Sequence, residues 1–272
     1  MNGAGGRRCD IFTESTKMQK DKRQVVAIIP SRYASSRFPG KPLMPIAGKP
    51  MIWHVVERAR RAACLSRVVV ATDDARIADA VQSFGGEVVM TGTNHISGSD
   101  RLAEAANILG LAASDIVINI QGDQPSFQPA VVEQVARPLL DDPALPMATL
   151  VYKIVRPEEI SDPNHVKTVF DRQGRALYFS RATIPFVRGT SGSTAPLPDY
   201  YKHLGFYAYR KDFLDIFVTL PEGEWERQEK LEQLRALEYG YPIQIVLTEH
   251  DSIEIDTPEE IRRVEAQLRA GN

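Results

Sequence analysis

The chain has 272 residues, of which 43% are hydrophobic and 25% charged, and its formal net charge is −2. This composition is typical of a globular protein with a sizeable core, and the near-neutral charge argues against nucleic acid as a partner. Cys9 and Cys64 suggest neither a disulfide framework nor a zinc site, which predicts a cytoplasmic location. No apolar run approaches the roughly 18 residues of a membrane span, so we expect no membrane insertion.

The N-terminal segment lacks the apolar core of a secretory signal peptide. We expect residues 1–23 to form a disordered extension and regard Met18 as a candidate start of the natural chain. Residues 24–272 carry the periodic apolar pattern of a folded region and are expected to form a single domain.

A basic loop follows the first buried strand. Val25–Ile29 is a continuous apolar run rich in branched residues, which predicts a strand at the centre of a parallel sheet. The loop after it begins at Pro30 and Ser31, and it carries three cations: Arg32, Arg37 and Lys41. Because ligands with phosphate groups bind beyond the carboxyl ends of such strands, we interpret the loop as a phosphate site; the alternative is a basic loop exposed to solvent.

Helices and strands alternate after this loop. The pattern predicts a helix from Met51, a strand over Arg67–Ala71, a helix over Ala75–Gly85, a strand over Glu87–Met90, a helix over Leu102–Gly110 and a strand over Asp115–Ile120. Such alternation with short joints indicates a mostly parallel sheet with helices on both faces. We expect His54 to be a packing residue, and Asp73 and Asp74 to cap the second helix.

The segment Ser97–Arg101 allows two interpretations. In one, Ser99 or Asp100 caps the following helix. In the other, the backbone and hydroxyl at Ser97 and Gly98 read the edge of a base, while Asp100 and Arg101 brace the pocket. The segment alone does not decide between them.

Asp123 lies in the segment Gln121–Pro125, directly after the strand that ends at Ile120. A carboxylate beyond a central strand, after a glycine that permits close approach, suits Mg²⁺, which takes one or two protein carboxylates. A single Asp after a strand is common, so the alternative is an ordinary loop residue.

The pattern changes after residue 146. Strands are expected at Met147–Val155, Val166–Phe170, Ala176–Phe179, Lys202–Tyr209 and Ile243–Leu247, with a hairpin turn at Asp171–Arg175. They predict a smaller antiparallel lobe around 147–210, inserted in the α/β fold. One continuous helix is expected over Arg227–Tyr239, and Asp256 precedes the last helix, where it can face the cleft.

Five separated segments together resemble one family: PSRYASSRFPGKPL, SGSDR, QGD, YFSRATIP with KHLGFYAY, and LEQLR followed by IDTPEE. They are similar to the 3-deoxy-manno-octulosonate (KDO) cytidylyltransferases, or CMP-KDO synthetases, and the resemblance runs from Val25 to about Leu268. It implies a nucleotide-diphospho-sugar transferase-like fold, CTP and KDO as substrates of a CMP transfer for lipopolysaccharide synthesis, a Mg²⁺ cofactor and a homodimer formed through the antiparallel lobe. Gln124 departs from the family, which usually has Glu there; the change removes a charge beside Asp123.

The resemblance also implies roles for individual residues. Its nucleotide site comprises Pro30, Ser31, Arg32, Arg37, Lys41, Ser97, Gly98, Arg101 and Gln121. Its sugar site comprises Arg181, His203, Tyr207, Glu232 and Gln233, with Arg181 and His203 as candidates for the sugar carboxylate. The catalytic candidates are Arg32, Lys41, Asp123 and Asp256, and the last two would hold Mg²⁺. The alternatives are a cytidylyltransferase for a related sugar acid such as amino-KDO, and a non-catalytic nucleotide-binding protein.

Overall fold

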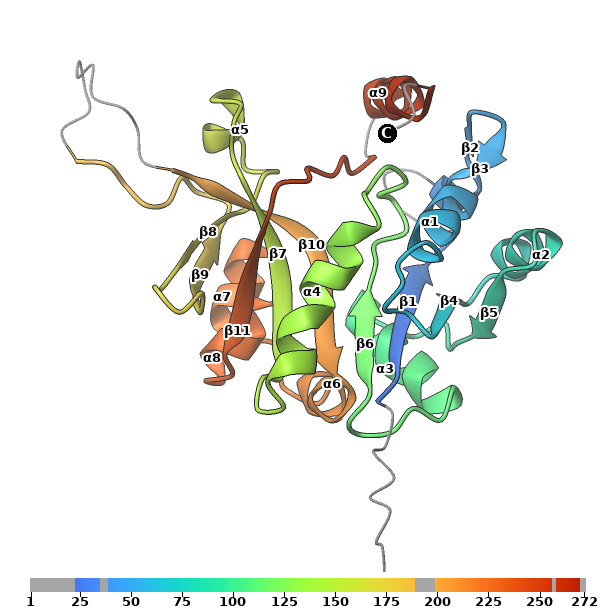
Figure 1. Ribbon diagram of the computed structural model, residues 1–272, viewed down its shortest axis with the longest axis horizontal. Coiled ribbons are helices and arrows are strands. Elements are labelled where there is room, and N and C mark those ends of the chain that lie inside the picture. The colour runs from blue at the N-terminus through green and yellow to red at the C-terminus, as the bar shows by residue number, and fades with distance from the viewer. Residues whose placement is uncertain (1–22, 35–38, 189–198, 256–257, 270–272) are drawn as a thin grey trace, which may run out of the picture.

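A mixed sheet forms the centre of the computed structural model, which describes residues 23–34, 39–188, 199–255 and 258–269 (Figure 1). The strands are β1 (Val25–Ser31), β4 (Arg67–Thr72), β5 (Glu87–Met90), β6 (Ile116–Asn119), β7 (Met147–Lys153), β8 (Lys167–Phe170), β9 (Ala176–Ser180), β10 (Tyr201–Arg210) and β11 (Ile243–Thr248). The small strands β2 (Pro45–Ile46) and β3 (Lys49–Pro50) form a separate hairpin.

The helices connect these strands. They are α1 (Met51–Ala59), α2 (Ala75–Ser83), α3 (Gly98–Ile108), α4 (Ala130–Asp141), α5 (Glu158–Ser161), α6 (Lys211–Phe217), α7 (Glu224–Glu229), α8 (Leu234–Glu238) and α9 (Pro258–Arg269). A short 3₁₀ turn covers Lys41–Leu43.

The main path of the sheet has the order β11-β7-β10-β6-β1-β4-β5. Neighbouring strands are parallel except at β10, which runs antiparallel to both β6 and β7. Strand β8 pairs antiparallel with β10 and with β9, so the antiparallel pairing expected around 147–210 is present. The prediction of a mostly parallel α/β sheet is confirmed.

Alternate residues of β1 face two different helical layers. Val25, Ala27 and Ile29 pack with α1, α2 and α4, whereas Val26 and Ile28 pack with α3, α6 and α8. Figure 1 shows α4 lying across the front of the sheet and α7 behind β11. Burial on both faces explains why this strand is apolar from Val25 to Ile29, and it makes β1 the rigid base from which the basic loop leaves.

Two local expectations about helices are wrong. The helix expected over Arg227–Tyr239 is interrupted at Lys230, which has φ 54° and ψ 48°, so that α7 and α8 are separate. The second concerns the cap of α3, which is Ser97 and not Ser99 or Asp100. The Ser97 hydroxyl accepts a bond from the Asp100 N–H, and the Asp100 carboxylate accepts one from the Ser97 N–H.

The second helix follows its prediction in part. Asp74 caps α2 by accepting a bond from the Arg76 N–H, as expected. Asp73 instead pairs with the buried guanidinium of Arg101 at 2.7 Å, so its capping role is wrong. The reason is a contact that the local sequence does not show, because 28 residues separate the two side chains.

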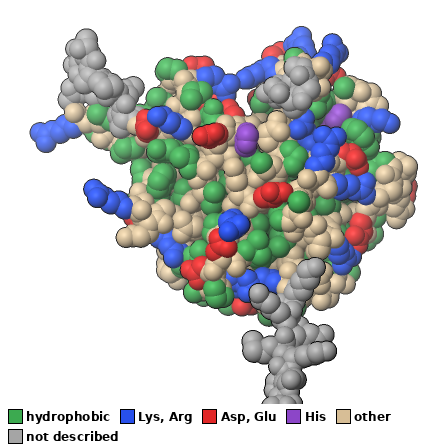
Figure 2. Space-filling model, viewed as in Figure 1, with side chains coloured by type: hydrophobic (Ala, Val, Ile, Leu, Met, Phe, Trp, Pro, Cys, Tyr) green, Lys and Arg blue, Asp and Glu red, His purple; other side chains and the backbone are tan. Residues whose placement is uncertain are grey.

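Basic and acidic side chains are interspersed on the face shown in Figure 2, and no large field of a single sign is visible there. Within the described part of the chain, no helix has both the length and the apolar character needed to cross a bilayer.

Candidate active site

Several of the predicted nucleotide residues lie together beyond the carboxyl ends of β1 and β6. Arg32 leaves the end of β1 and donates from Nη2 to the carbonyl oxygen of Ser97 at 2.9 Å, which joins the basic loop to the cap of α3. Gly98 lies close to Pro30, since a Cβ built on it would be 3.7 Å from the proline ring. The first two segments of the predicted nucleotide site are therefore in contact.

The loop after β6 lies against the same place. A Cβ on Gly122 would be 3.1 Å from Ser31 Oγ, so the glycine allows the two loops to pack closely. Gln121 donates from Nε2 to the carbonyl oxygen of Gly205 at 3.3 Å, which connects the nucleotide side to β10. Close packing here brings the predicted nucleotide and sugar segments together.

Lys41 and Asp123 form an ion pair at the centre of this region. Lys41 Nζ lies 2.7 Å from Asp123 Oδ2, and the side chains are only 11% and 25% exposed. The other carboxylate oxygen, Oδ1, is buried and accepts no hydrogen bond from the described residues. The Ile255 N–H donates to the Asp123 carbonyl oxygen at 3.0 Å, so the segment before Asp256 runs beside Asp123. Asp256 itself, like Arg37, lies outside the described residues.

Gln124, the departure from the family pattern, uses both ends of its amide. Its Nε2 donates to the carbonyl oxygen of Leu204 at 2.8 Å, and its Oε1 accepts a bond from Ser252 Oγ at 3.2 Å. The side chain is buried and ties the Asp123 loop to β10 and to the chain before Asp256. Sequence reasoning considered only the lost charge and missed this bridge.

His203 and Tyr207 lie on the same side of β10, with ring centroids 5.1 Å apart, as the two-residue repeat predicted. Gly205, with φ 74°, forms an irregularity between them, and this backbone conformation favours glycine. Burial lowers the pKa of His203 to about 3 and raises that of Tyr207 well above its usual range. Both side chains are therefore neutral near pH 7.

Thr149 determines the tautomer of His203. Its hydroxyl donates to the Phe206 carbonyl oxygen at 2.7 Å, so the same oxygen must accept from His203 Nε2, 2.9 Å away. The neutral imidazole then carries its proton on Nε2 and presents Nδ1 as an acceptor. Thr149 was not predicted; a threonine within an otherwise apolar buried strand was the available signal.

Glu232 and Gln233 lie in the turn between α7 and α8. Ser99 Oγ donates to Glu232 Oε2 at 2.7 Å, which joins this turn to α3 at the nucleotide side. Burial raises the pKa of Glu232 against the lowering effect of hydrogen bonds from Ser99 and Ser97. Among the described residues, neither Glu232 Oε1 nor the buried Gln233 Nε2 has a hydrogen-bond partner, although Arg235 Nη2 lies 4.0 Å from that oxygen.

Several buried polar atoms have no hydrogen-bond partner among the described residues. Five of them belong to predicted site residues: Ser31 Oγ, Arg101 Nε, Asp123 Oδ1, Glu232 Oε1 and Gln233 Nε2. Buried polar atoms are normally satisfied, and leaving one unpaired costs about 1–3 kcal/mol. Unpartnered atoms at predicted site residues are explained if a polar ligand completes their hydrogen bonds.

Two predicted arginines are engaged with the protein itself. Arg101 is fully buried, and its guanidinium binds Asp73 and Thr91, so it supports the loop before α3 from behind. The Arg181 guanidinium donates to the backbone carbonyl oxygens of Pro163, Glu229 and Lys230. A bracing role for Arg101 was one of the two interpretations of its segment, whereas the contacts of Arg181 were not expected from the sequence.

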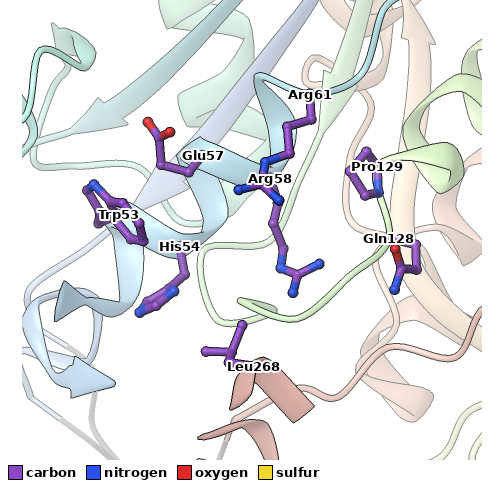
Figure 3. Close-up of a pocket in the computed structure, with 8 residues that line it drawn as sticks. All are labelled: Trp53, His54, Glu57, Arg58, Arg61, Gln128, Pro129 and Leu268. Carbon is purple, nitrogen blue, oxygen red and sulfur yellow. The ribbon is translucent and has the colours of Figure 1, made fainter. Parts of the chain in front are cut away.

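A separate cavity of about 340 Å³ lies beside α1, and Figure 3 shows its lining. Its walls are Trp53, His54, Glu57, Arg58, Arg61, Gln128, Pro129 and Leu268, none of which is a predicted site residue. His54 is buried, and its Nε2 lies 2.7 Å from the carbonyl oxygen of Ile46, in agreement with its predicted packing role.

Comparison with known proteins decides the family. Residues 26–252 match the cytidylyltransferase family model. A 3-deoxy-manno-octulosonate cytidylyltransferase from Syntrophus aciditrophicus is 59% identical over 241 residues, which cover 89% of this chain and 96% of that protein. The chain belongs to the 3-deoxy-manno-octulosonate cytidylyltransferase family. The resemblance carried by the five sequence segments is thus confirmed.

Two further comparisons support membership of this cytidylyltransferase family. An 8-amino-3,8-dideoxy-manno-octulosonate cytidylyltransferase from Shewanella pealeana is 56% identical over 247 residues, covering 90% of this chain and 98% of that protein. The solved structure of a CMP:2-keto-3-deoxy-manno-octonic acid synthetase complexed with CTP has a TM-score of 0.83 and 44% identity, covering 92% of this chain and all of that one. The chain is therefore an enzyme of the nucleotidyltransferase class.

Proposed function

We propose that this enzyme transfers CMP from CTP to the anomeric hydroxyl of KDO, giving CMP-KDO and pyrophosphate. The observation that carries the proposal is the Lys41–Asp123 pair at the carboxyl ends of β1 and β6. It lies in a chain that is 59% identical to a KDO cytidylyltransferase. A cation and a carboxylate held together at the end of a central strand suit a phosphate group and its counter-ion.

In this reaction the sugar hydroxyl attacks the α-phosphorus of CTP, and pyrophosphate leaves from the opposite side. Negative charge develops on the phosphate oxygens, so the protein contributes mainly positioning and electrostatic stabilisation. Arg32 and Lys41, together with Arg37 on the same loop, supply the positive charge for the triphosphate. Arg32 offers a planar fork of donors, whereas Lys41 is a compact charge.

Asp123 fits a role as a Mg²⁺ ligand, because its Oδ1 is a buried acceptor without a hydrogen-bond donor among the described residues. Asp256 is proposed as the second carboxylate. The described residues contain no group of three or more His, Cys, Asp or Glu side chains for a metal, which agrees with the few protein ligands that Mg²⁺ requires. When bound, Mg²⁺ would supply charge neutralisation at the phosphate and a lower pKa for the sugar hydroxyl.

The sugar side is proposed to comprise His203, Tyr207, Glu232 and Gln233. Because His203 Nε2 donates to Thr149 and the imidazole is neutral, Nδ1 is left as an acceptor, and we assign it to a sugar hydroxyl rather than to a charge opposite the carboxylate. The Glu232 carboxylate and the Gln233 amide supply the complementary acceptor and donor.

We further propose that the enzyme acts in the cytoplasm as a homodimer, in the synthesis of lipopolysaccharide. Exposed apolar side chains in the antiparallel lobe, Val155, Leu177 and Phe186, support an interface there. The absence of a disulfide or zinc pattern among the cysteines supports the compartment.

A second candidate substrate is 8-amino-KDO, because a relative with that name is 56% identical. The two sugars differ in a hydroxyl and an amine. We place KDO first because the KDO cytidylyltransferase from Syntrophus aciditrophicus is 59% identical to this chain.

Pyrophosphate release by the purified protein with CTP and Mg²⁺ tests the proposal. Parallel reactions would contain KDO, 8-amino-KDO, a sialic acid or no sugar, and UTP would replace CTP in a further set. Release that requires both CTP and KDO is expected. Preference for 8-amino-KDO would reassign the sugar, and tight CTP binding without release with any acceptor would indicate a nucleotide-binding protein instead.

A further inference from the structure

The chain leaves α7 through a left-handed residue. Lys230 has φ 54° and ψ 48°, a conformation that residues other than glycine disfavour because Cβ crowds the backbone. The turn ends α7 and places Glu232 beside Ser99 of α3. A strained backbone of this kind persists only where surrounding contacts hold it.

Residues at the end of β9 supply these contacts. Arg181 donates from Nε to the Glu229 carbonyl oxygen at 2.7 Å and from Nη2 to the Lys230 carbonyl oxygen at 3.3 Å. In return, the Glu229 carboxylate accepts bonds from the Arg181 N–H at 2.9 Å and from Ser180 Oγ at 2.6 Å. We call Ser180, Arg181, Glu229 and Lys230 the turn clamp.

The turn clamp is itself anchored. Lys167 is fully buried, and its Nζ donates to the Arg181 carbonyl oxygen at 2.8 Å. Arg181 also donates from Nη1 to the Pro163 carbonyl oxygen at 3.0 Å. Its guanidinium therefore binds three backbone carbonyl groups, and a carboxylate ligand would have to compete with them.

We propose that Arg181 is a positioning residue, which holds the turn at Lys230 so that Glu232 and Gln233 face the sugar acid, and that it does not itself bind the sugar carboxylate. The inference rests on the function proposed above. It changes the role expected for Arg181 from substrate contact to support of Glu232 and Gln233, each of which has a buried polar atom without a partner among the described residues.

Steady-state pyrophosphate release, with KDO and CTP varied separately, tests this role. Arg181→Met and Glu229→Ala should each raise KM for KDO about tenfold or more and change KM for CTP less than about twofold. Arg181→Lys should behave like Arg181→Met, because an ammonium group cannot span two carbonyl groups as the guanidinium does. Arg172→Met, at an exposed arginine in the turn between β8 and β9, is the matched control and should change neither constant.

The double variant separates a shared role from two independent ones. Arg181→Met combined with Glu229→Ala should be little worse than either single variant, because both changes open the same clamp. Fully additive losses would contradict a single shared function.

Hydrogen–deuterium exchange over residues 226–238 provides a readout that needs no substrate. Exchange should be faster in Arg181→Met and Glu229→Ala than in the wild type and in Arg172→Met. Unchanged exchange in both variants would overturn the proposal. So would a normal KM for KDO in both Arg181→Lys and Glu229→Ala, and either result would assign Arg181 to the sugar carboxylate. A wild-type protein that releases no pyrophosphate with any sugar acid would refute the proposed function separately.

Discussion

Replacing Lys202 by Met should destabilise the protein strongly, because Lys202 is the most buried cation of a charge cluster at the start of β10. Its Nζ lies 3.0 Å from Glu159 Oε2 and 3.0 Å from Asp251 Oδ1. The Lys202 and Glu159 side chains are only 4% and 3% exposed. The cluster joins α5, β10 and the segment after β11, which continues towards Asp256.

The magnitude follows from what the substitution leaves behind. Removing one partner of a buried ion pair costs about 3–5 kcal/mol, because an uncompensated charge remains. Arg156 still hydrogen-bonds to Glu159 and lies 3.5 Å from Asp251, so we expect the lower end, about 3 kcal/mol. Lys153→Met is the matched control: Lys153 pairs with Asp199 at 2.7 Å, but both side chains are 52% exposed, and the change should be small.

Urea denaturation of both variants at pH 7 and pH 4 measures the effect. Burial alone would raise the pKa of Glu159, but hydrogen bonds from Lys202 and Arg156 hold it below 4.5. The stabilisation from this depressed pKa is present above pH 4.5 and is lost as the pH falls through the folded-state value. The difference in the free energy of unfolding between the wild type and Lys202→Met should therefore be smaller at pH 4 than at pH 7. An equal small loss in both variants at pH 7 would refute the reasoning.

Three further predictions concern the site. Asp123→Asn should lower turnover about 100-fold or more with the fold intact, because it removes a carboxylate proposed to hold Mg²⁺ and paired with Lys41; normal turnover at saturating Mg²⁺ would contradict that role. Gly205→Ala should reduce the free energy of unfolding by about 1–2 kcal/mol, because φ is 74° there. Urea denaturation measures this loss, and an unchanged free energy of unfolding would contradict the prediction. The pKa of His203 is lowered to about 3, so the unfolded state binds the extra proton below pH 6.5 and stability falls as the pH decreases. His203→Gln should lose less thermal stability than the wild type between pH 7 and pH 5, and an identical loss would argue against a neutral His203.

The fold was predictable where short-range patterns report burial. The apolar run at Val25–Ile29 predicted a strand covered on both faces, and the structure confirms it. Alternating strands and helices predicted the parallel half of the sheet. The successive strands and the hairpin turn around 147–210 predicted antiparallel pairing. The spacing of apolar side chains and the polarity of the connecting loops are local properties, so they can be seen directly in the sequence.

Part of the site was predictable for the same reason. Polar loops after β1 and β6 must meet when the two strands are parallel neighbours, and Arg32, Ser97 and Asp123 do lie at the same edge. The sequence did not reveal that Lys41 pairs with Asp123, or that Gln124 bridges Leu204 to Ser252, since those contacts depend on how the loops pack.

By itself, the sequence determined the α/β architecture, the family and the loops that carry the candidate site. Only the tertiary structure decided the break at Lys230. The local sequence favours a continuous helix there, but hydrogen bonds from Arg181, 48 residues away from Glu229 in the chain, hold the turn instead. The tertiary structure likewise decided that His203 presents an acceptor, because Thr149 on the neighbouring strand uses its own proton elsewhere. Long-range hydrogen bonds fix these features, and no local pattern of residues records which distant groups will supply them.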